Sequence, residues 1–266
     1  MPMAEWRKWH AMELPMNSKL ARRQILSMAL GLILATPVLA QESNKVLVVG
    51  ASGGTGRFII AMLEEQGYEV VPTSRNPERA AETVGGDFAW RQMDLTSTES
   101  VDAAVRDVDF VVTAHGATEA EGPNDPEQVD WIGTRHLIDV AGKIGVKHYV
   151  MISAASAGNP DSPLNERFGN VLVWKGHAED YLRESGLPYT IVRGPGLRDN
   201  PGGEKPIVLE QGGSGRRLME REDLATVTVA VLNNEAAMGK TFVARNADEG
   251  GASVDLQEQL LNLLPD

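Results

Sequence analysis

The sequence predicts an α/β fold: a single domain built on a doubly wound, Rossmann-like parallel sheet. Short apolar runs without polar alternation indicate strands that are buried on both faces. These runs alternate with segments of helical periodicity, which is typical of βαβ units. The chain has 266 residues, enough to bury a full core, and we find no internal repeat and no second-domain linker. The predicted domain covers residues 41–266.

The first βαβ unit is the most clearly patterned part of the chain. Val46–Val49 form an apolar run that enters a glycine-rich turn, and FIIAMLEEQG then has helical spacing and closes at Gly67. A second strand is expected over 68–73. A weak third strand is expected over 87–93, followed by a capping box that begins a helix.

Later elements follow the same alternation. Further strands are expected at 110–114, 148–153, 189–193 and 241–244, and further helices at 129–142, 171–185, 222–232 and 254–264. The polar stretch 116–128 is long enough to be a functional lid. Residues 196–218 are rich in glycine, proline and charge, and are expected to hold the substrate-side loops.

Composition excludes several classes of function. The chain has no cysteine, so disulfides, thiolate nucleophiles and thiolate metal sites are excluded. Its formal charge of −12 argues against nucleic acid or an anionic membrane surface as a partner. No histidine and carboxylate pair has convincing metal-ligand spacing, and no hydrolase triad signature is present. We therefore expect no metal, and a small-molecule partner or none.

The N-terminus has the pattern of an export signal. Basic residues that include Arg22 and Arg23 precede the apolar run 25–40, which ends in small residues suited to cleavage after Ala40. ARRQILS resembles a twin-arginine signal, which would send a folded, cofactor-loaded protein to the periplasm. The alternative is an uncleaved membrane anchor, although the run is shorter than the roughly 20 residues of a spanning helix.

The glycine-rich turn predicts a dinucleotide site. Gly50, Gly53 and Gly56 have the spacing that permits a tight turn, close approach to a pyrophosphate and close helix–sheet packing. Backbone N–H groups and the helix dipole at such a junction favour a phosphate. Additional ligand groups are expected from Gly54 and from the hydroxyls of Ser52 and Thr55.

Arg75 predicts which dinucleotide is bound. It lies at the end of the second strand, where an acidic residue would bind a ribose 2′-hydroxyl and an arginine suits a 2′-phosphate. A charge-assisted contact of this kind contributes roughly 1.5–3 kcal/mol. We therefore expect NADP in preference to NAD, the alternative being a solvated loop arginine.

Several segments together resemble one family. VLVVGASGGTGR, TSRNPE, MDLTSTES, VVTAHGA, VDWIGTRHLIDVAGKIGVKHYVMIS, WKGHAEDYLRESGLPYTIVR and MEREDLATV are similar to the atypical short-chain dehydrogenase/reductases of the NAD(P)-binding, NmrA-like branch. The resemblance covers nearly all of residues 45–245. It implies that Asp94 and Leu95 flank the adenine, that Ala114 and His115 line the ribose and pyrophosphate, and that Ser153 borders the nicotinamide.

The chain departs from that family at one catalytic position. Alcohol-oxidising or carbonyl-reducing relatives carry a tyrosine four residues before a lysine; here Lys175 is present, but Val171 occupies the tyrosine's position. Tyr181 follows six residues later and should face another way. Lys175 could still donate to the nicotinamide ribose hydroxyls, the alternative being a surface lysine.

These features lead to two open hypotheses. The first is an NADP(H)-dependent reductase of a flavin- or quinone-like acceptor, with Lys175 and Ser153 as its catalytic residues, because such an acceptor can take its proton from water. The second is a non-catalytic NADP-binding sensor or assembly partner. A sugar-nucleotide epimerase is disfavoured by the missing tyrosine. His115 could donate a proton, or could simply be solvated.

Overall fold

The computed structural model describes residues 44–212, 218–248 and 254–266, all of which belong to one compact unit spanning 42–266. The predicted signal peptide, its cleavage point and the membrane-anchor alternative lie outside the described residues. Within the described ranges, every helix is too short or too polar to cross a membrane.

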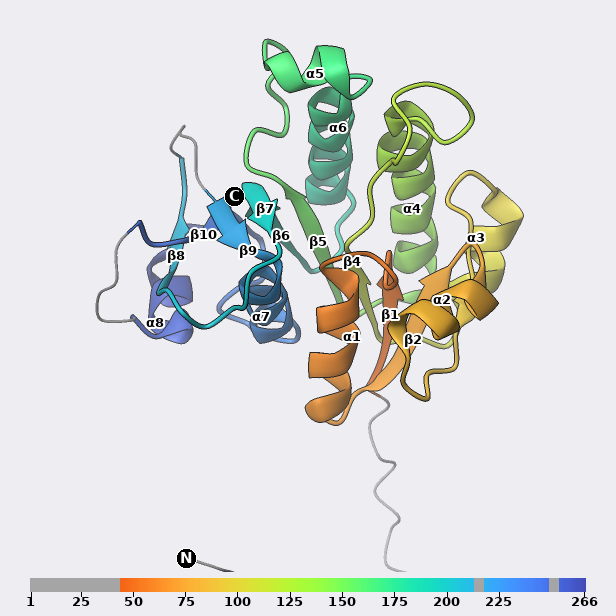
Figure 1. The fold of residues 1–266 in the computed structure, drawn as a ribbon, viewed down its shortest axis with the longest axis horizontal. Coiled ribbons are helices and arrows are strands. Elements are labelled where there is room, and N and C mark those ends of the chain that lie inside the picture. The colour runs from red at the N-terminus through yellow and green to blue at the C-terminus, as the bar shows by residue number, and fades with distance from the viewer. Residues whose placement is uncertain (1–43, 213–217, 249–253) are drawn as a thin grey trace, which may run out of the picture. The chain divides into compact units, whose positions relative to one another are not determined.

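The core of the fold is an eight-stranded sheet (Figure 1). Its strand order is β3-β2-β1-β4-β5-β6-β10-β8, so the first six strands have the 3-2-1-4-5-6 order of doubly wound dinucleotide-binding folds. All pairs are parallel except β8 with β10. The strands are β1 (Lys45–Val49), β2 (Glu69–Ser74), β3 (Arg91–Gln92), β4 (Phe110–Thr113), β5 (His148–Ala154), β6 (Tyr189–Gly194), β8 (Ile207–Glu210) and β10 (Lys240–Asn246).

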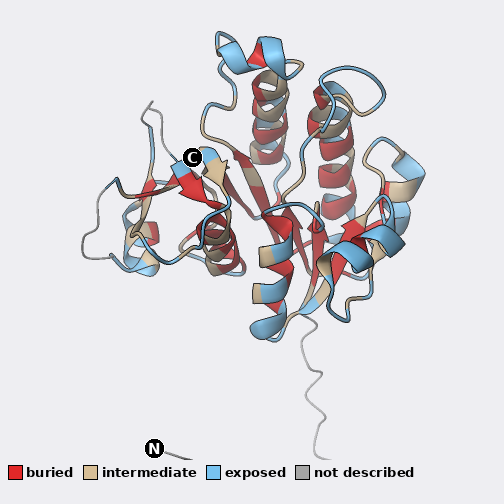
Figure 2. Ribbon diagram, in the orientation of Figure 1, coloured by how far each residue is buried: buried red, intermediate tan, exposed pale blue. Residues whose placement is uncertain are grey.

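Helices cover both faces of this sheet, as the continuous apolar strands require. One face packs against α1 (Gly56–Glu65), α7 (Arg221–Val231) and α8 (Leu256–Asn262). The other packs against α3 (Thr98–Ala104), α4 (Thr134–Ile144) and α6 (Val171–Glu184). Figure 2 shows the central strands buried between these layers, with exposed residues on the outer sides of the helices. The predicted α/β doubly wound fold is therefore confirmed.

Four local predictions differ from the structure. The third strand is reduced to Arg91–Gln92, and α2 (Pro77–Val84) and α5 (Pro163–Arg167) were not expected. The segment 196–218 contains strands as well as loops, namely β7 (Gly196–Arg198) paired with β9 (Leu218–Glu220), and β8 at the sheet edge. Periodicity is a weak signal for strands of two to four residues, which explains the differences at β3, β7, β8 and β9. The helix predicted at 129–142 begins instead as a π-helix, η1 (Glu127–Gly133).

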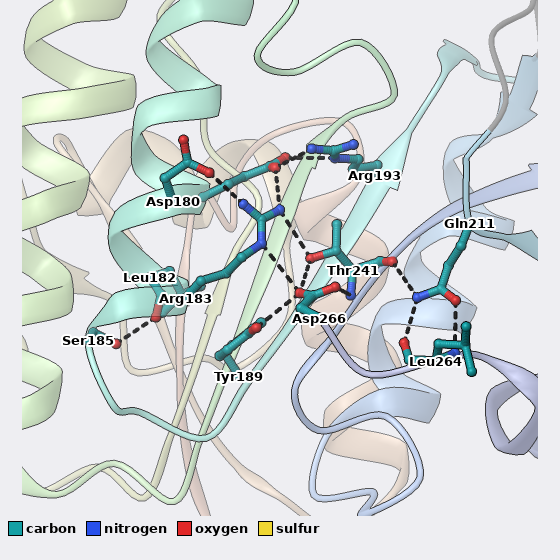
Figure 3. Close-up of polar contacts among 11 residues, drawn as sticks. Asp180, Leu182, Arg183, Ser185, Tyr189, Arg193, Gln211, Thr241, Leu264 and Asp266 are labelled. Atoms are coloured by element: carbon teal, nitrogen blue, oxygen red, sulfur yellow. Dashed lines mark hydrogen bonds and ion pairs between the residues drawn. The ribbon is translucent and has the colours of Figure 1, made fainter.

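The last residue is fixed to the sheet by side-chain hydrogen bonds (Figure 3). The Oδ2 atom of Asp266 accepts hydrogen bonds from Tyr189 Oη at 2.9 Å and from Thr241 Oγ1 at 2.5 Å, and it pairs with Arg183 Nε at 3.3 Å. Arg183 also pairs with the buried Glu179 at 2.9 Å. These contacts tie α6, β6 and β10 together on the side of the sheet that carries α6.

Candidate functional site

A cavity of about 470 Å³ opens at the carboxyl ends of β1, β2 and β4. Ligand sites of open α/β sheets are found at this edge, and the volume is in the range of small-molecule pockets. Eight of the residues predicted to bind a cofactor line it: Gly50, Ser52, Gly53, Arg75, Asp94, Leu95, Ala114 and His115. Residues Gly116, Ala117, Thr118 and Asn124 of the predicted lid line it as well.

The glycine turn is shaped by close backbone contacts. Gly50 has a φ of 80°, and a Cβ added there would lie 2.7 Å from the backbone nitrogen of His115. A Cβ on Gly56 would lie 2.2 Å from the carbonyl oxygen of Gly50, with which Gly53 N forms a 3.0 Å hydrogen bond. Glycine is therefore required at these positions for the turn to close against β4 and α1.

This turn leaves the N-terminus of α1 free of competing groups. Thr55 makes no side-chain capping hydrogen bond, and the first turn carries no acidic residue. The backbone thus fits a pyrophosphate, since no side-chain oxygen competes for this helix end and the positive end of the helix dipole remains for an anion. Thr55 is buried, and Gly54, Thr55 and Gly56 are the predicted cofactor-binding residues of the turn that do not line the cavity.

Two arginines line the cavity at the end of β2. Arg75 follows the strand directly, and Arg79 lies in the first turn of α2, where its backbone N–H donates to the N-cap Asn76 Oδ1 at 2.9 Å. Both are exposed, and neither guanidinium makes an ion pair with another residue in the described part of the chain. Two unpaired cations at a cavity rim suit a phosphate or another anion.

The residues that follow the short strand β3 line another part of this cavity. Asp94 Oδ1 accepts hydrogen bonds from Thr96 N at 3.0 Å and from Thr96 Oγ1 at 2.8 Å, which fixes the turn before α3. The carbonyl oxygen of Leu95 packs so closely on η1 that a Cβ on Gly133 would lie 2.3 Å from it. Asp94 and Leu95 therefore line the cavity as members of a rigid turn.

Lys175 and Ser153 lie together in a second, smaller cavity of about 10 Å³. Lys175 Nζ forms a 2.7 Å ion pair with Asp130 Oδ1, and the Asp130 side chain is fully buried. Asp130 Oδ2 also accepts a hydrogen bond from Ala117 N at 3.0 Å. Lys175 is only 19% exposed, so the interpretation as a surface lysine is wrong. The Oγ of Ser153 is buried and has no hydrogen-bond partner among the described residues.

His115 lines both cavities and so connects them. Its Nε2 lies 2.9 Å from Thr134 Oγ1, whose proton is donated to the carbonyl oxygen of Val129 at 3.0 Å. The Nε2 atom must then be the protonated one, which leaves the Nδ1 lone pair available as an acceptor. Burial, and secondly the Lys175 ammonium, lower the pKa of His115 to about 4. His115 is thus a neutral, anchored side chain and is not a solvated loop histidine.

None of the four tyrosines lines either cavity. Tyr181 Oη donates to Asp139 Oδ1 at 2.6 Å, so it faces away from Lys175 as predicted. Tyr189 is bonded to Asp266, Tyr149 is fully buried, and Tyr68 packs edge-on against Phe110. The chain therefore places no phenolic proton donor beside Lys175.

The end of β5 and helix α6 meet without intervening side chains. A Cβ on Gly176 would lie 2.5 Å from the Cα of Gly158, and Gly158 N donates to the carbonyl oxygen of Leu172 at 2.7 Å. Gly176 is the neighbour of Lys175, and Gly158 lies in the turn that follows β5. The turn after β5 is therefore in direct backbone contact with α6 beside Lys175.

The structure also identifies site residues that sequence reasoning missed. Arg79 was not predicted because the Asn-Pro pair at 76–77, a helix-start signal, was not recognised as the beginning of α2. Asp130 had no recognisable signal, since its role depends on contact between η1 and α6. Among the described residues, no group of three or more histidine, aspartate or glutamate side chains is arranged to hold a metal.

Comparison with known proteins identifies the family of the chain. Residues 50–235 match the model of a family described as NAD(P)H-binding. An uncharacterized chloroplastic protein of Arabidopsis thaliana is 32% identical over 232 residues, covering 79% of this chain and 71% of the relative. Sanguinarine reductase of Eschscholzia californica is 29% identical over 255 residues, covering 80% and 93%.

A solved structure shares the architecture as well. A putative NAD-dependent epimerase/dehydratase from Bacillus halodurans superposes with a TM-score of 0.69 at 30% identity, covering 77% of this chain and 95% of that one. The match to the family model spans the glycine turn, both cavities and α7. The chain is therefore a member of the NAD(P)H-binding family, within the NmrA-like, atypical short-chain dehydrogenase/reductase group.

Proposed function

We propose that the chain is an NADP(H)-dependent oxidoreductase that reduces a flavin- or quinone-like acceptor. The observation that carries this proposal is the pairing of Lys175 with buried Asp130 at a site where no tyrosine is present. A lysine held in this way can position hydroxyl groups, but the chain supplies no phenol to protonate an alkoxide. An aromatic acceptor that takes its proton from water removes that need.

The residues present fit a dinucleotide. The glycine turn would hold the pyrophosphate, Asp94 and Leu95 would border the adenine, and Ala114 with His115 would border the central part. Lys175 and Ser153 would contact the nicotinamide end, where the unpartnered Ser153 Oγ requires a polar group. The bound cofactor would supply the hydride. The preference for NADP over NAD is supported by the two unpaired arginines at the cavity rim, Arg75 and Arg79.

His115 has a positioning role in this proposal. The Nε2–H of His115 donates a hydrogen bond to Thr134 Oγ1. The Nδ1 atom of His115 can therefore accept a hydrogen bond from a bound hydroxyl or amide. With a pKa of about 4, the imidazole stays neutral at pH 7 and is a poor proton donor. We therefore assign it to binding.

We further propose export to the periplasm by the twin-arginine route, on the strength of the ARRQILS sequence and the apolar run ending at Ala40. The chain would then fold around its cofactor before crossing the membrane. Expression of the whole chain with fractionation and intact mass measurement tests this. A mass that begins at Gln41 in the periplasmic fraction is expected, and an uncleaved chain in the membrane fraction would support the anchor instead.

The central experiment is a titration of residues 41–266 with NADPH and NADH by calorimetry. Arg75→Ala should weaken NADPH binding by about 10-fold or more and leave NADH unchanged. Arg167→Ala, an exposed arginine on α5 that does not line the cavity, is the matched control. If neither dinucleotide binds the wild-type chain, the proposal is wrong.

Turnover separates the enzyme from the non-catalytic alternative. Consumption of NADPH with generic quinone and flavin acceptors is expected, and it should fall in Lys175→Met. Tight binding of NADPH without consumption by any acceptor would support the sensor or assembly partner. That alternative is favoured by one observation only, the replacement of the usual tyrosine by Val171.

A further inference from the structure

Gly54 is not explained by the dinucleotide turn. Gly50, Gly53 and Gly56 provide the spacing that the turn needs, and Gly54 does not have a positive φ. A Cβ added at Gly54 would lie 2.9 Å from Cδ and 3.0 Å from Nε of Arg221. The missing side chain therefore makes room for an arginine that comes from a distant part of the chain and lies directly against the turn.

Arg221 is held in this place by its surroundings. It is the first residue of α7, which packs beside α1 on the same face of the sheet. Its Nε forms a 3.0 Å ion pair with Asp199 Oδ1, and its side chain is 30% exposed. Among the described residues, the Arg221 guanidinium makes no ion pair other than the one with Asp199. Its two terminal nitrogens, Nη1 and Nη2, therefore remain as donors for a ligand.

The residues next to Arg221 brace the loop that carries Asp199. Glu220 Oε1 pairs with Arg198 at 2.6 Å, Glu222 accepts from Gly202 N at 2.8 Å, and Asp223 accepts from Gly203 N at 2.7 Å. The loop on one side and α7 on the other thus set the direction of the Arg221 side chain. A cation fixed against a phosphate-binding turn loses little further entropy when it binds an anion.

We propose that Arg221 binds the pyrophosphate of the cofactor at its nicotinamide-side phosphate. This inference rests on the proposed dinucleotide site. The side is indicated by the cavity that holds Arg75 and Arg79, whose described lining includes Ser52 and Gly53 but neither Gly54 nor Arg221. Arg221 meets the turn at Gly54, outside that cavity, and we therefore assign it to the phosphate farther from the two arginines.

Calorimetry with three ligands tests this proposal: NADPH, NADH and adenosine 2′,5′-bisphosphate, which lacks the nicotinamide-side phosphate. Arg221→Ala should weaken NADPH and NADH alike, by about 10-fold or more, and leave the bisphosphate unchanged. Arg221→Lys should recover part of the loss. Unchanged NADPH binding in Arg221→Ala, or an equal loss for the bisphosphate, would overturn the inference. A wild-type chain that binds none of the three would instead refute the site itself.

Asp199→Asn is the control for a purely structural role. It removes the charge of the same ion pair but keeps the cation and an amide oxygen that can accept from Nε, so NADPH affinity should fall much less than in Arg221→Ala. If Asp199→Asn weakens NADPH as much as Arg221→Ala does, the ion pair is what matters and the proposal is wrong. Thermal unfolding of each variant shows whether the fold is retained.

Discussion

Asp130 holds Lys175 through a buried ion pair of 2.7 Å that joins η1 to α6. Asp130 lies within the π-helix, whose wider turns place side chains differently from those of an α-helix. Asp130 also accepts a hydrogen bond from Ala117 N, in the loop after β4. One carboxylate therefore connects η1 with α6 and with the loop after β4.

Asp130→Asn should damage both stability and binding. The change keeps the size of the side chain but leaves the Lys175 ammonium, which is mostly buried, without its counter-ion. We expect the free energy of unfolding to fall by about 1–3 kcal/mol and NADPH affinity to decrease. Urea denaturation and calorimetry measure the two effects. Asp180→Asn, which breaks the exposed pair with Arg183, should change stability by less than about 0.5 kcal/mol.

Two glycines of the same turn should respond differently to alanine. A Cβ at Gly56 would lie 2.2 Å from a backbone oxygen that cannot move easily, so Gly56→Ala should destabilise the fold by about 1–3 kcal/mol. At Gly54 the neighbours are side-chain atoms of Arg221, which can shift more easily than backbone although Asp199 pairs with them, so Gly54→Ala should cost less than Gly56→Ala. Thermal unfolding of both variants tests this, and equal losses would contradict it.

Stability should fall in mild acid because of His148. This residue is buried, its Nε2 lies 3.0 Å from Thr190 Oγ1, and its Nδ1 accepts from Asn233 N at 3.1 Å. Burial lowers the pKa of His148 to about 4, whereas an unfolded histidine titrates near about 6.5. The unfolded chain therefore binds more protons between these values, and the contribution present above about pH 6.5 is lost as the pH falls toward 4.

Denaturation curves from neutral pH down to about 4 measure that loss, which should be about 3 kcal/mol for His148. His115 has a similarly lowered pKa and should add to the slope. His148→Gln should be less stable than the wild-type chain at neutral pH but should depend less on pH. A slope that His148→Gln leaves unaltered would show that other groups are responsible.

Arg79 should share the 2′-phosphate with Arg75. Both arginines line the same cavity. Like Arg75, Arg79 makes no ion pair with another residue in the described part of the chain. Arg79→Ala should weaken NADPH binding by about fivefold, close to 1 kcal/mol, with NADH unchanged. Equal weakening of both dinucleotides would instead indicate a general electrostatic effect.

Much of the fold could be predicted from local patterns. The apolar runs around Val46–Val49 and Phe110–Thr113 are strands buried on both faces, and this burial is visible in the sequence as uninterrupted hydrophobicity. The glycine spacing identified the turn, and Arg75 follows the end of β2 as predicted. These features depend on residues that are neighbours in the sequence, so the sequence alone is enough to predict them.

The rest of the site depends on contacts between distant segments. Asp130 meets Lys175, and Arg221 meets Gly54, through packing that no periodicity reveals. The strand β8 is added antiparallel to the sheet edge by pairing with β10, although its own four residues have no distinctive pattern. Sequence reasoning therefore found residues that line one cavity, but it did not find contacts between distant segments such as the Asp130–Lys175 pair.

The contact between Gly158 and Gly176 limits which side chains the chain tolerates between the turn after β5 and helix α6. Backbone meets backbone there, so any side chain at Gly176 would push the turn and the helix apart. Gly176 follows Lys175 directly, and such a displacement would also move the lysine that pairs with Asp130. The absence of one side chain thus helps to set the place of the charged residue beside it.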